Sequence, residues 1–210
     1  MKADNKAKAV ETMVLSRIYG NGRGWAFFAN DFSDLGSREA VHLALHRLEK
    51  KETIRRVIRG LYEYPRYSDL LAQCMAPDMD EVARALARRF GWSIQATGPA
   101  ALNLIGLSSQ VPGRYAYRSD GPRRTYMVGK TSLEFKPGAL KDAGFRLAES
   151  GILVEALKSL GEARINAETL AKCRSWLPAT KHAAVLKDTQ RVTGWVYDAI
   201  KEICVGAGNG

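Results

Sequence analysis

The sequence predicts an α+β protein in two domains, a first domain over residues 1–68 and a mixed α/β domain over residues 69–210. Apolar residues recur at the three- and four-residue spacing of helices along much of the chain. After residue 52 the period changes to two, which is typical of strands. The length of 210 residues suits one large domain or two small ones.

The N-terminal residues predict three helical segments in succession. Apolar spacing indicates a first helix over residues 4–19, and a short one is expected over residues 30–35. Ser37 is typical of an N-cap, because its hydroxyl can accept a hydrogen bond from a free backbone amide at a helix start. We therefore expect a third helix over residues 38–51, with three apolar side chains on one face: Val41, Leu45 and Leu48.

The next segment predicts a β-hairpin. Residues 53–58 are rich in β-branched residues, Arg59 and Gly60 suit a turn, and residues 61–64 suit a returning strand that ends at Pro65. The order helix, short helix, turn, helix and two-stranded hairpin is that of a winged helix-turn-helix. We expect this fold for the first domain.

The remaining residues predict a mixture of helices and strands. Residues 78–90 predict an amphipathic helix, with acidic side chains in its first turn and arginines toward its end, as the helix dipole favours. A strand is expected over residues 114–118 and a hairpin over residues 125–136. Three further helices are expected over residues 144–160, 167–176 and 183–204.

The charge balance predicts a polyanionic partner. The chain has 32 Lys+Arg against 22 Asp+Glu, a formal net charge of +10. A basic excess of this size is typical of proteins that bind nucleic acid or an anionic membrane surface.

No run of residues approaches the ~18 apolar residues of a membrane span, and residues 1–9 do not suit a secretory signal. We expect a cytoplasmic protein without a membrane partner.

No metal site is predicted. The three cysteines, Cys74, Cys173 and Cys204, lack the even number and the close spacing of a disulfide framework or a zinc site. His42 and His46 are four residues apart and could in principle bind a metal from one helix face, but no carboxylate or thiol nearby completes a ligand set. We expect the three cysteines to be free thiols in a reducing compartment.

The third predicted helix suits DNA recognition. In a helix-turn-helix the second helix of the pair lies in the major groove, with its N-terminal residues at the base edges. Arg38 is the best candidate for a base contact, because its planar fork can bond a guanine edge with two hydrogen bonds. Residues 47–66 contain seven basic residues and three glutamates, which suits phosphate contacts. The predicted DNA-binding residues are Ser37, Arg38, His42, Arg47, Lys50, Lys51, Arg55, Arg56 and Arg59.

These assignments predict different variant behaviour. Arg38→Ala should lose discrimination between operator and random DNA, whereas Arg55→Ala should weaken binding to both and lower the salt dependence.

Two alternatives to DNA binding fit the same pattern of helices and basic residues. Charge on a helix is often only a solvated face, and winged helices also serve as protein-interaction modules.

A second basic segment lies between residues 114 and 130, where five basic residues accompany a single acid, Asp120, and three interleaved tyrosines. Such a surface could bind nucleic acid, a nucleotide or an acidic protein face. The alternative is a solvated strand face with tyrosines in the core. The basic residues are Arg114, Arg118, Arg123, Arg124 and Lys130.

Catalytic motifs are absent from the sequence. It contains no Walker loop, GxSxG, HExxH or GxGxxG motif, and the glycine-rich residues 20–24 follow a helix and lack the Lys-Ser/Thr of a phosphate loop. We therefore expect neither an enzyme nor a cofactor. An enzyme acting on nucleotides is the alternative, and it would need a carboxylate cluster in a basic cleft.

Several motifs resemble the AbiEi-like antitoxins, which are bacterial transcriptional regulators paired with abortive-infection toxins. The resemblance covers about residues 5–200. It rests on Gly-Leu-Ser-Ser-Gln-Val-Pro at residues 106–112, Tyr117 with residues 120–124, Leu-Glu-Phe-Lys at residues 133–136, and Arg-Gly-Leu-Tyr at residues 59–62.

The resemblance implies a type IV toxin–antitoxin system. The first domain would bind inverted repeats in its own promoter and repress the operon. The second domain would oppose a nucleotidyltransferase-like toxin without a stable complex, with the basic segment of residues 114–130 as its antitoxic surface. The alternatives are a stand-alone regulator whose second domain senses a ligand or dimerises, and a protein- or RNA-interaction module.

Overall fold

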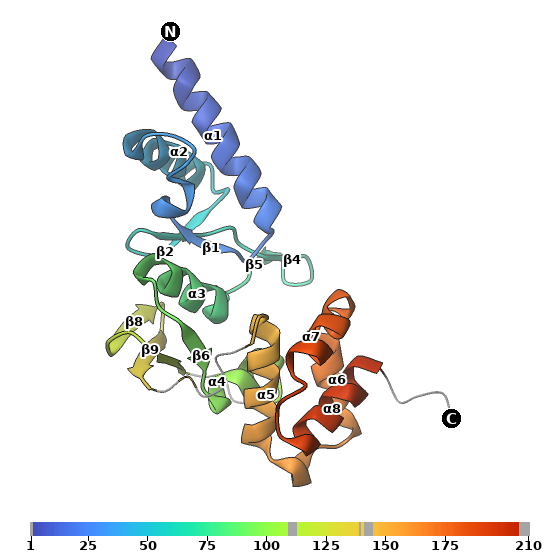
Figure 1. Cartoon of the computed structure of the whole chain (residues 1–210). Helices are drawn as coiled ribbons and strands as arrows, with labels where there is room; N and C mark the ends of the chain where they lie inside the picture. The colour runs from blue at the N-terminus through green and yellow to red at the C-terminus, as the bar shows by residue number, and fades with distance from the viewer. Residues whose placement is uncertain (1, 109–112, 139, 141–144, 206–210) are drawn as a thin grey trace. The chain divides into compact units, whose positions relative to one another are not determined.

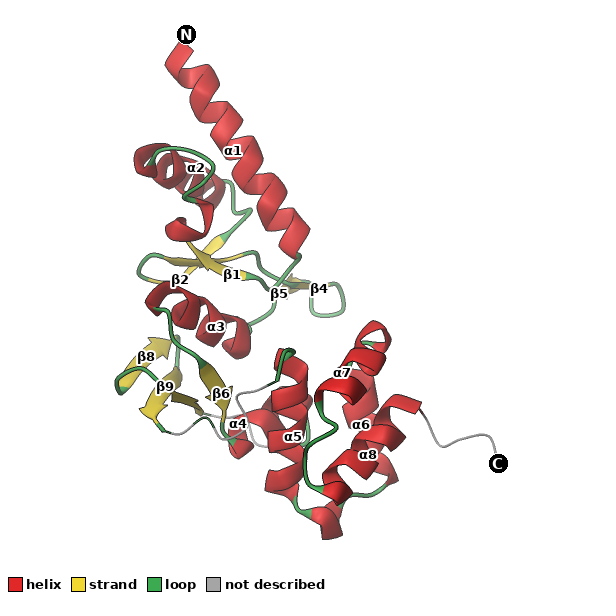
Figure 2. Ribbon diagram, in the orientation of Figure 1, coloured by secondary structure: helices red, strands yellow, loops and turns green. Residues whose placement is uncertain are grey.

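The fold is α+β, as the sequence predicts (Figures 1 and 2). It was derived from a computed structural model, which describes residues 2–108, 113–138, 140 and 145–205, and side chains from residue 8 onward. Contacts between backbone positions divide the chain into two compact units.

The N-terminal unit comprises Met1–Trp92 with Met127–Lys130, and the C-terminal unit comprises Ser93–Tyr126 with Thr131–Gly210. The sequence predicts a first domain that ends at residue 68. The compact unit extends further because α3 (Met79–Phe90) packs against β1 (Ala26–Phe28).

Three further helices build the N-terminal unit (Figure 1). They are α1 (Lys2–Asn21), the short 3-10 helix η1 (Ala29–Phe32) and α2 (Arg38–Lys50). Ser37 precedes α2 with extended backbone angles, and its hydroxyl accepts a hydrogen bond from the amide of Ala40 at 3.3 Å. The predicted N-cap is therefore confirmed.

The strands of this unit form two antiparallel sheets. In the first, β3 (Leu61–Glu63) lies between β1 and β2 (Arg55–Ile58). The second is a separate two-stranded hairpin of β4 (Tyr67–Ser68) and β5 (Gln73–Cys74). Gly60 makes the turn between β2 and β3 with φ of +79°, a value that glycine adopts without a steric penalty.

The core of the unit joins α1, α2 and the first sheet. Val41, Leu45 and Leu48 of α2 are buried, which confirms the predicted helix face. Removing one of these side chains down to Cβ costs about 2–5 kcal/mol in typical cores. The cluster also contains Val10, Val14, Ile18, Phe27, Phe32, Ala44, Ile54 and Tyr62.

A four-stranded sheet in the order β6-β7-β9-β8 lies in the C-terminal unit except for the end of β8, which the division assigns to the N-terminal unit. Its strands are β6 (Ile94–Ala96), β7 (Arg114–Ser119), β8 (Arg124–Val128) and β9 (Thr131–Pro137). In this order β9 lies between β7 and β8, and it pairs in parallel with β7. Side chains of Leu133 and Phe135 are fully buried on one face of β9.

Helices complete the C-terminal unit, and one prediction for them is wrong. The expected single helix over residues 183–204 is broken after Asp188 and resumes at Gly194. The amide and hydroxyl of Thr189 both donate to the carbonyl of Val185 at the end of the first piece, and the carbonyl of Thr193 accepts the first hydrogen bonds of the second. The helices are α4 (Gly98–Ile105), α5 (Ala148–Leu160), η2 (Glu162–Arg164), α6 (Ala167–Trp176), η3 (Ala179–Lys181), α7 (His182–Asp188) and α8 (Gly194–Val205).

Candidate nucleic-acid interface

Four residues define an exposed α2 face, Arg38, His42, His46 and Lys50. Their spacing of four residues places them along one side of the helix. From Arg38 to Lys50 this side spans roughly 18 Å at ~1.5 Å per residue. Within the described part of the chain, Arg38, His42 and Lys50 make no hydrogen bond or ion pair that would hold them in place.

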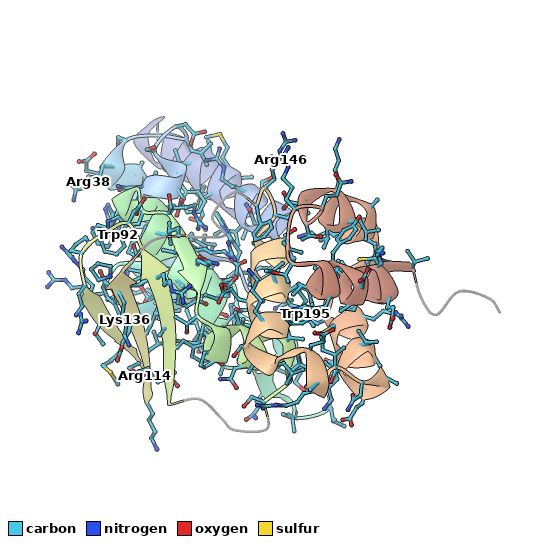
Figure 3. All side chains as sticks on the ribbon, turned by 60° about the horizontal axis from the view of Figure 1, so that its bottom comes forward. Arg38, Trp92, Arg114, Lys136, Arg146 and Trp195 are labelled. Carbon is cyan, nitrogen blue, oxygen red and sulfur yellow. The ribbon has the colours of Figure 1, made fainter. Side chains whose placement is uncertain are left out.

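Arg38 stands at the start of this face (Figure 3), beside a hollow of about 350 Å³ between η1 and α2. Asn30 and Ser33 of the preceding turn line the same hollow. The site therefore combines a free guanidinium with polar groups from two helical segments, which suits hydrogen bonding to a base edge.

Arg17 of α1 fixes the turn that leads into α2. Its two terminal nitrogens each donate to one carboxylate oxygen of Asp34 at 2.7 Å, and Nη1 also donates to the carbonyl of Asp31 at 2.9 Å. The hydrogen bonds from Arg17 lower the pKa of Asp34 to about 2. Sequence spacing gives no sign of this contact, because the partners are 17 residues apart.

Two of the predicted DNA-binding residues hold α1 onto α2. Glu11 of α1 lies 2.5 Å from the Nζ of Lys51 and 3.6 Å from Arg47. Lys51 remains mostly exposed, and such surface pairs contribute little stability and exchange readily with other anions. Lys51 can therefore reach a phosphate at the cost of a weak contact to Glu11, whereas Arg47 is only one-third exposed and is held against α1.

Arg55 is engaged within the sheet. Its Nε donates to Oε2 of Glu63 at 2.8 Å, and Glu63 is fully buried. Burial raises the pKa of Glu63, and the hydrogen bond from Arg55 opposes that shift. A phosphate contact by Arg55, as the sequence predicts, would have to break a buried ion pair.

Arg56 and Arg59 lie on the exposed side of the β2–β3 hairpin. Arg56 donates to Glu49 at 2.9 Å, lies 5.5 Å from the Tyr62 ring and stays half exposed. Arg59 is exposed in the turn, and no hydrogen bond or ion pair of its side chain occurs among the described residues. Arg56 and Arg59 therefore add positive charge to the N-terminal unit, which also carries the α2 face.

The second predicted basic surface is neutralised in part by acids of its own unit. On the sheet, Arg114 of β7 lies 3.5 Å from Glu134 of β9, and Lys136 lies 3.5 Å from the same carboxylate. Figure 3 labels Arg114 and Lys136 on these neighbouring strands. Lys136 belongs to this face by strand register, although it lies outside the basic segment of residues 114–130 that the sequence predicts.

Arg118 makes a deeper contact. It lies 3.7 Å from Glu155 of α5, a buried carboxylate that also accepts from Gln95 at 2.9 Å. Arg123, Arg124 and Lys130 are exposed around β8. Of the three interleaved tyrosines, Tyr117 is buried, and Tyr115 and Tyr126 are half-buried.

The sequence profile of one protein family matches residues 13–185, which is most of the chain. The chain belongs to DUF6088, a family of unknown function. The crystal structure of the RV2827C protein from Mycobacterium tuberculosis is similar over 98% of this chain and 78% of that chain, with 12% identity and a TM-score of 0.41. No curated protein matches the chain significantly.

The region matched by DUF6088 contains every predicted site residue, from Ser37 to Lys130. It also contains the stretch at residues 106–112 that resembles the antitoxins, of which residues 109–112 lie outside the described part of the structure.

The part of this DUF6088 chain that the structure describes contains neither a metal-binding cluster nor a membrane-spanning helix. Across residues 2–108, 113–138, 140 and 145–205, no group of three or more His, Cys, Asp or Glu side chains is placed to hold a metal ion. In the same residues, no helix combines the length and apolar character needed to span a membrane.

Proposed function

We propose that the N-terminal unit is a winged helix-turn-helix that binds duplex DNA and represses the operon that encodes it. The observation that carries this proposal is the α2 face, an exposed helix side whose arginine and lysine have no hydrogen bond or ion pair among the described residues. A basic face of this kind suits the DNA major groove, which admits an α-helix.

The arrangement of elements supports the assignment. In chain order, α1, β1, η1, α2, β2 and β3 follow the helix, strand, helix, helix and hairpin order of winged helices. The sheet order β1-β3-β2 brings the hairpin back beside the first strand. The Ser37 cap fixes where α2 begins and so where its first turn meets the DNA.

We assign distinct roles to the basic residues. Arg38 contacts a base edge, because it stands in the first turn of α2 and its fork is free to bond two acceptors. Lys50, Arg56 and Arg59 contact phosphates, which supplies affinity without sequence information. Arg55 supports the hairpin through Glu63.

For the C-terminal unit we propose an antitoxic role against a nucleotidyltransferase-like toxin in the cytoplasm. The resemblance of residues 120–124 and 133–136 to the antitoxins supports it, as does the basic face that carries Arg114, Arg118 and Lys136. Co-expression with the product of the neighbouring gene tests this role. Growth rescue by the full chain is expected, and unchanged toxicity contradicts the role.

Fluorescence anisotropy with a labelled duplex from the chain's own upstream region tests the DNA-binding role. Binding should weaken steeply as salt rises, because phosphate contacts release counterions, with a log–log slope of about −0.9 per contact. A protein that shows no salt-dependent binding to any duplex contradicts the proposal. If the C-terminal unit alone accounts for the DNA binding, the assignment of DNA binding to α2 is contradicted.

A further inference from the structure

A polar hollow of about 340 Å³ lies within the N-terminal unit. It forms where the turn after α1, the segment after β3 and the start of α3 meet. Its wall includes Arg23, Gly24, Trp25, Arg66, Asp78 and Glu81. The volume corresponds to about eleven water molecules at ~30 Å³ each and lies in the range of small-ligand pockets, roughly 300–1,000 Å³. The predicted DNA-binding residues do not line it.

Arg66 presents an unmet donor in this wall. Its Nη2 donates to Asp78 at 2.5 Å, while its buried Nε has no acceptor among the described residues. Gly24 provides the space for this guanidinium, because a Cβ at that position would lie 3.0 Å from the Nε of Arg66. A buried donor without an acceptor costs free energy. Because the Arg66 side chain as a whole is about half exposed, a small shift would let its Nε reach an anionic ligand group and recover that cost.

Arg23 supplies a second, oriented guanidinium. Its Nη1 donates to the carbonyl of Pro65 at 2.8 Å, and its guanidinium lies 4.7 Å from the Tyr64 ring. These contacts fix the plane of the side chain at the edge of the hollow. A guanidinium group held in a fixed plane can bind a carboxylate with two parallel hydrogen bonds.

Glu81 supplies the opposite charge. It is half-buried, and its carboxylate makes no hydrogen bond or ion pair with the residues that the structure describes. Burial raises its pKa, the nearby carboxylates of Asp78 and Asp80 raise it further, and the charges of Arg84 and Arg88 oppose the shift only in part. A cationic ligand group beside Glu81 would offset both effects.

We propose that this hollow binds an α-amino acid, with the ligand carboxylate on Arg23 and Arg66 and its ammonium group on Glu81. A simple anion would meet the carboxylates of Asp78 and Glu81, and a simple cation would meet the two guanidinium groups. Only a ligand that carries both charges satisfies both sides of the wall. The indole of Trp25 provides an apolar surface for the ligand side chain.

Isothermal titration of the full chain with each proteinogenic amino acid tests the proposal. At least one amino acid should bind, and at about tenfold its Kd it should raise the melting temperature by roughly 5 °C. The amide of that amino acid lacks the carboxylate, and its N-acetyl derivative lacks the ammonium group. Each derivative should bind at least about tenfold more weakly, since each loses one charged contact.

Glu81→Gln keeps the shape of the side chain and removes its charge, so it should weaken binding at least about tenfold. Glu134→Gln, in the C-terminal sheet, is the matched control and should leave binding unchanged. The proposal is overturned if no amino acid binds, if both derivatives bind as well as the parent, or if Glu81→Gln binds normally. The derivative comparison needs no variant, and DNA binding can succeed or fail independently of all three results.

Discussion

Arg55 and Glu63 face each other across the β2–β3 hairpin, with Nε and Oε2 2.8 Å apart and the glutamate fully buried. This contact separates the basic residues of the N-terminal unit into two classes. Some stabilise the fold, and others are available to a partner. A net charge of +10 does not distinguish them, whereas the contacts do.

Arg55→Gln should destabilise the protein without removing a DNA contact. Breaking a buried pair by removing one partner typically costs about 3–5 kcal/mol, and we expect roughly 2–3 kcal/mol here because Arg55 is partly exposed. Urea unfolding near neutral pH measures this cost. The cost should shrink at lower pH, because a protonated Glu63 needs no counter-charge. A variant as stable as the parent would contradict the role of the pair.

Arg38→Ala should reduce sequence discrimination. If Arg38 bonds a guanine edge, the variant loses about 1–3 kcal/mol of binding free energy on its specific duplex and little on random DNA. Competition titrations with both duplexes measure the difference. Equal losses on the two duplexes would show that Arg38 contacts phosphate instead of a base.

Arg59→Ala should weaken binding to all duplexes by a similar factor. A lost phosphate contact lowers the magnitude of the salt slope by about one unit. Arg55→Gln is the matched comparison, because its folded fraction should keep the parental slope. If Arg59→Ala keeps the salt slope of the parent, the β2–β3 turn is not part of the DNA interface.

Asp34→Asn should alter stability in acid. The pKa of Asp34 is lowered to about 2 by hydrogen bonds from Arg17, so ionised Asp34 stabilises the fold above the ordinary aspartate pKa of about 4. This contribution is lost as the pH falls from about 4 toward 2. Urea midpoints should therefore differ between parent and variant near neutral pH and converge in acid. Midpoints that stay equally far apart would contradict the Arg17 contact.

The cysteines should react at different rates with an aromatic disulfide reagent. Cys74 is exposed, whereas Cys173 is buried and its pKa is raised by burial to about 11. Because the thiolate is the reacting species, Cys74 should react fast and Cys173 only after unfolding. Cys74→Ser should remove the fast phase. Rapid labelling of Cys173 in the folded protein would contradict its placement in the core.

The sequence predicts α2 well because the residues that define this helix lie close together in the chain. The Ser37 hydroxyl accepts from the amide of a residue only three positions later, and Val41, Leu45 and Leu48 share a face through helical spacing alone. The exposure of Arg38 follows from the same periodicity, since it lies off the buried face. These features need no knowledge of distant partners.

The partner of Arg55 depends on a register that the sequence does not reveal. A regular hairpin with a two-residue turn at residues 59–60 would place Arg56 opposite Glu63. A bulge between Arg56 and Ile58 shifts the pairing, so that Arg55 faces Glu63 and Arg56 faces Tyr62. One extra residue therefore exchanges which arginine is bound inside the sheet and which stays exposed.

The basic surface of the C-terminal unit shows the same limit. Chain order suggests that β7 pairs with β8, but β9 takes that place and runs parallel to β7. Glu134 thereby reaches Arg114, 20 residues earlier in the sequence. Counts of charge along a segment cannot include acids that arrive from another strand.

The affinity ratio between the chain's own upstream duplex and a scrambled duplex of equal length, measured for the parent and for Arg38→Ala at about 0.15 M salt, tests the central claim most directly. We predict that the parent prefers its own duplex by at least about 10³-fold and that Arg38→Ala loses at least about tenfold of this preference. Equal affinities of the parent for the two duplexes would contradict the claim that α2 reads DNA sequence.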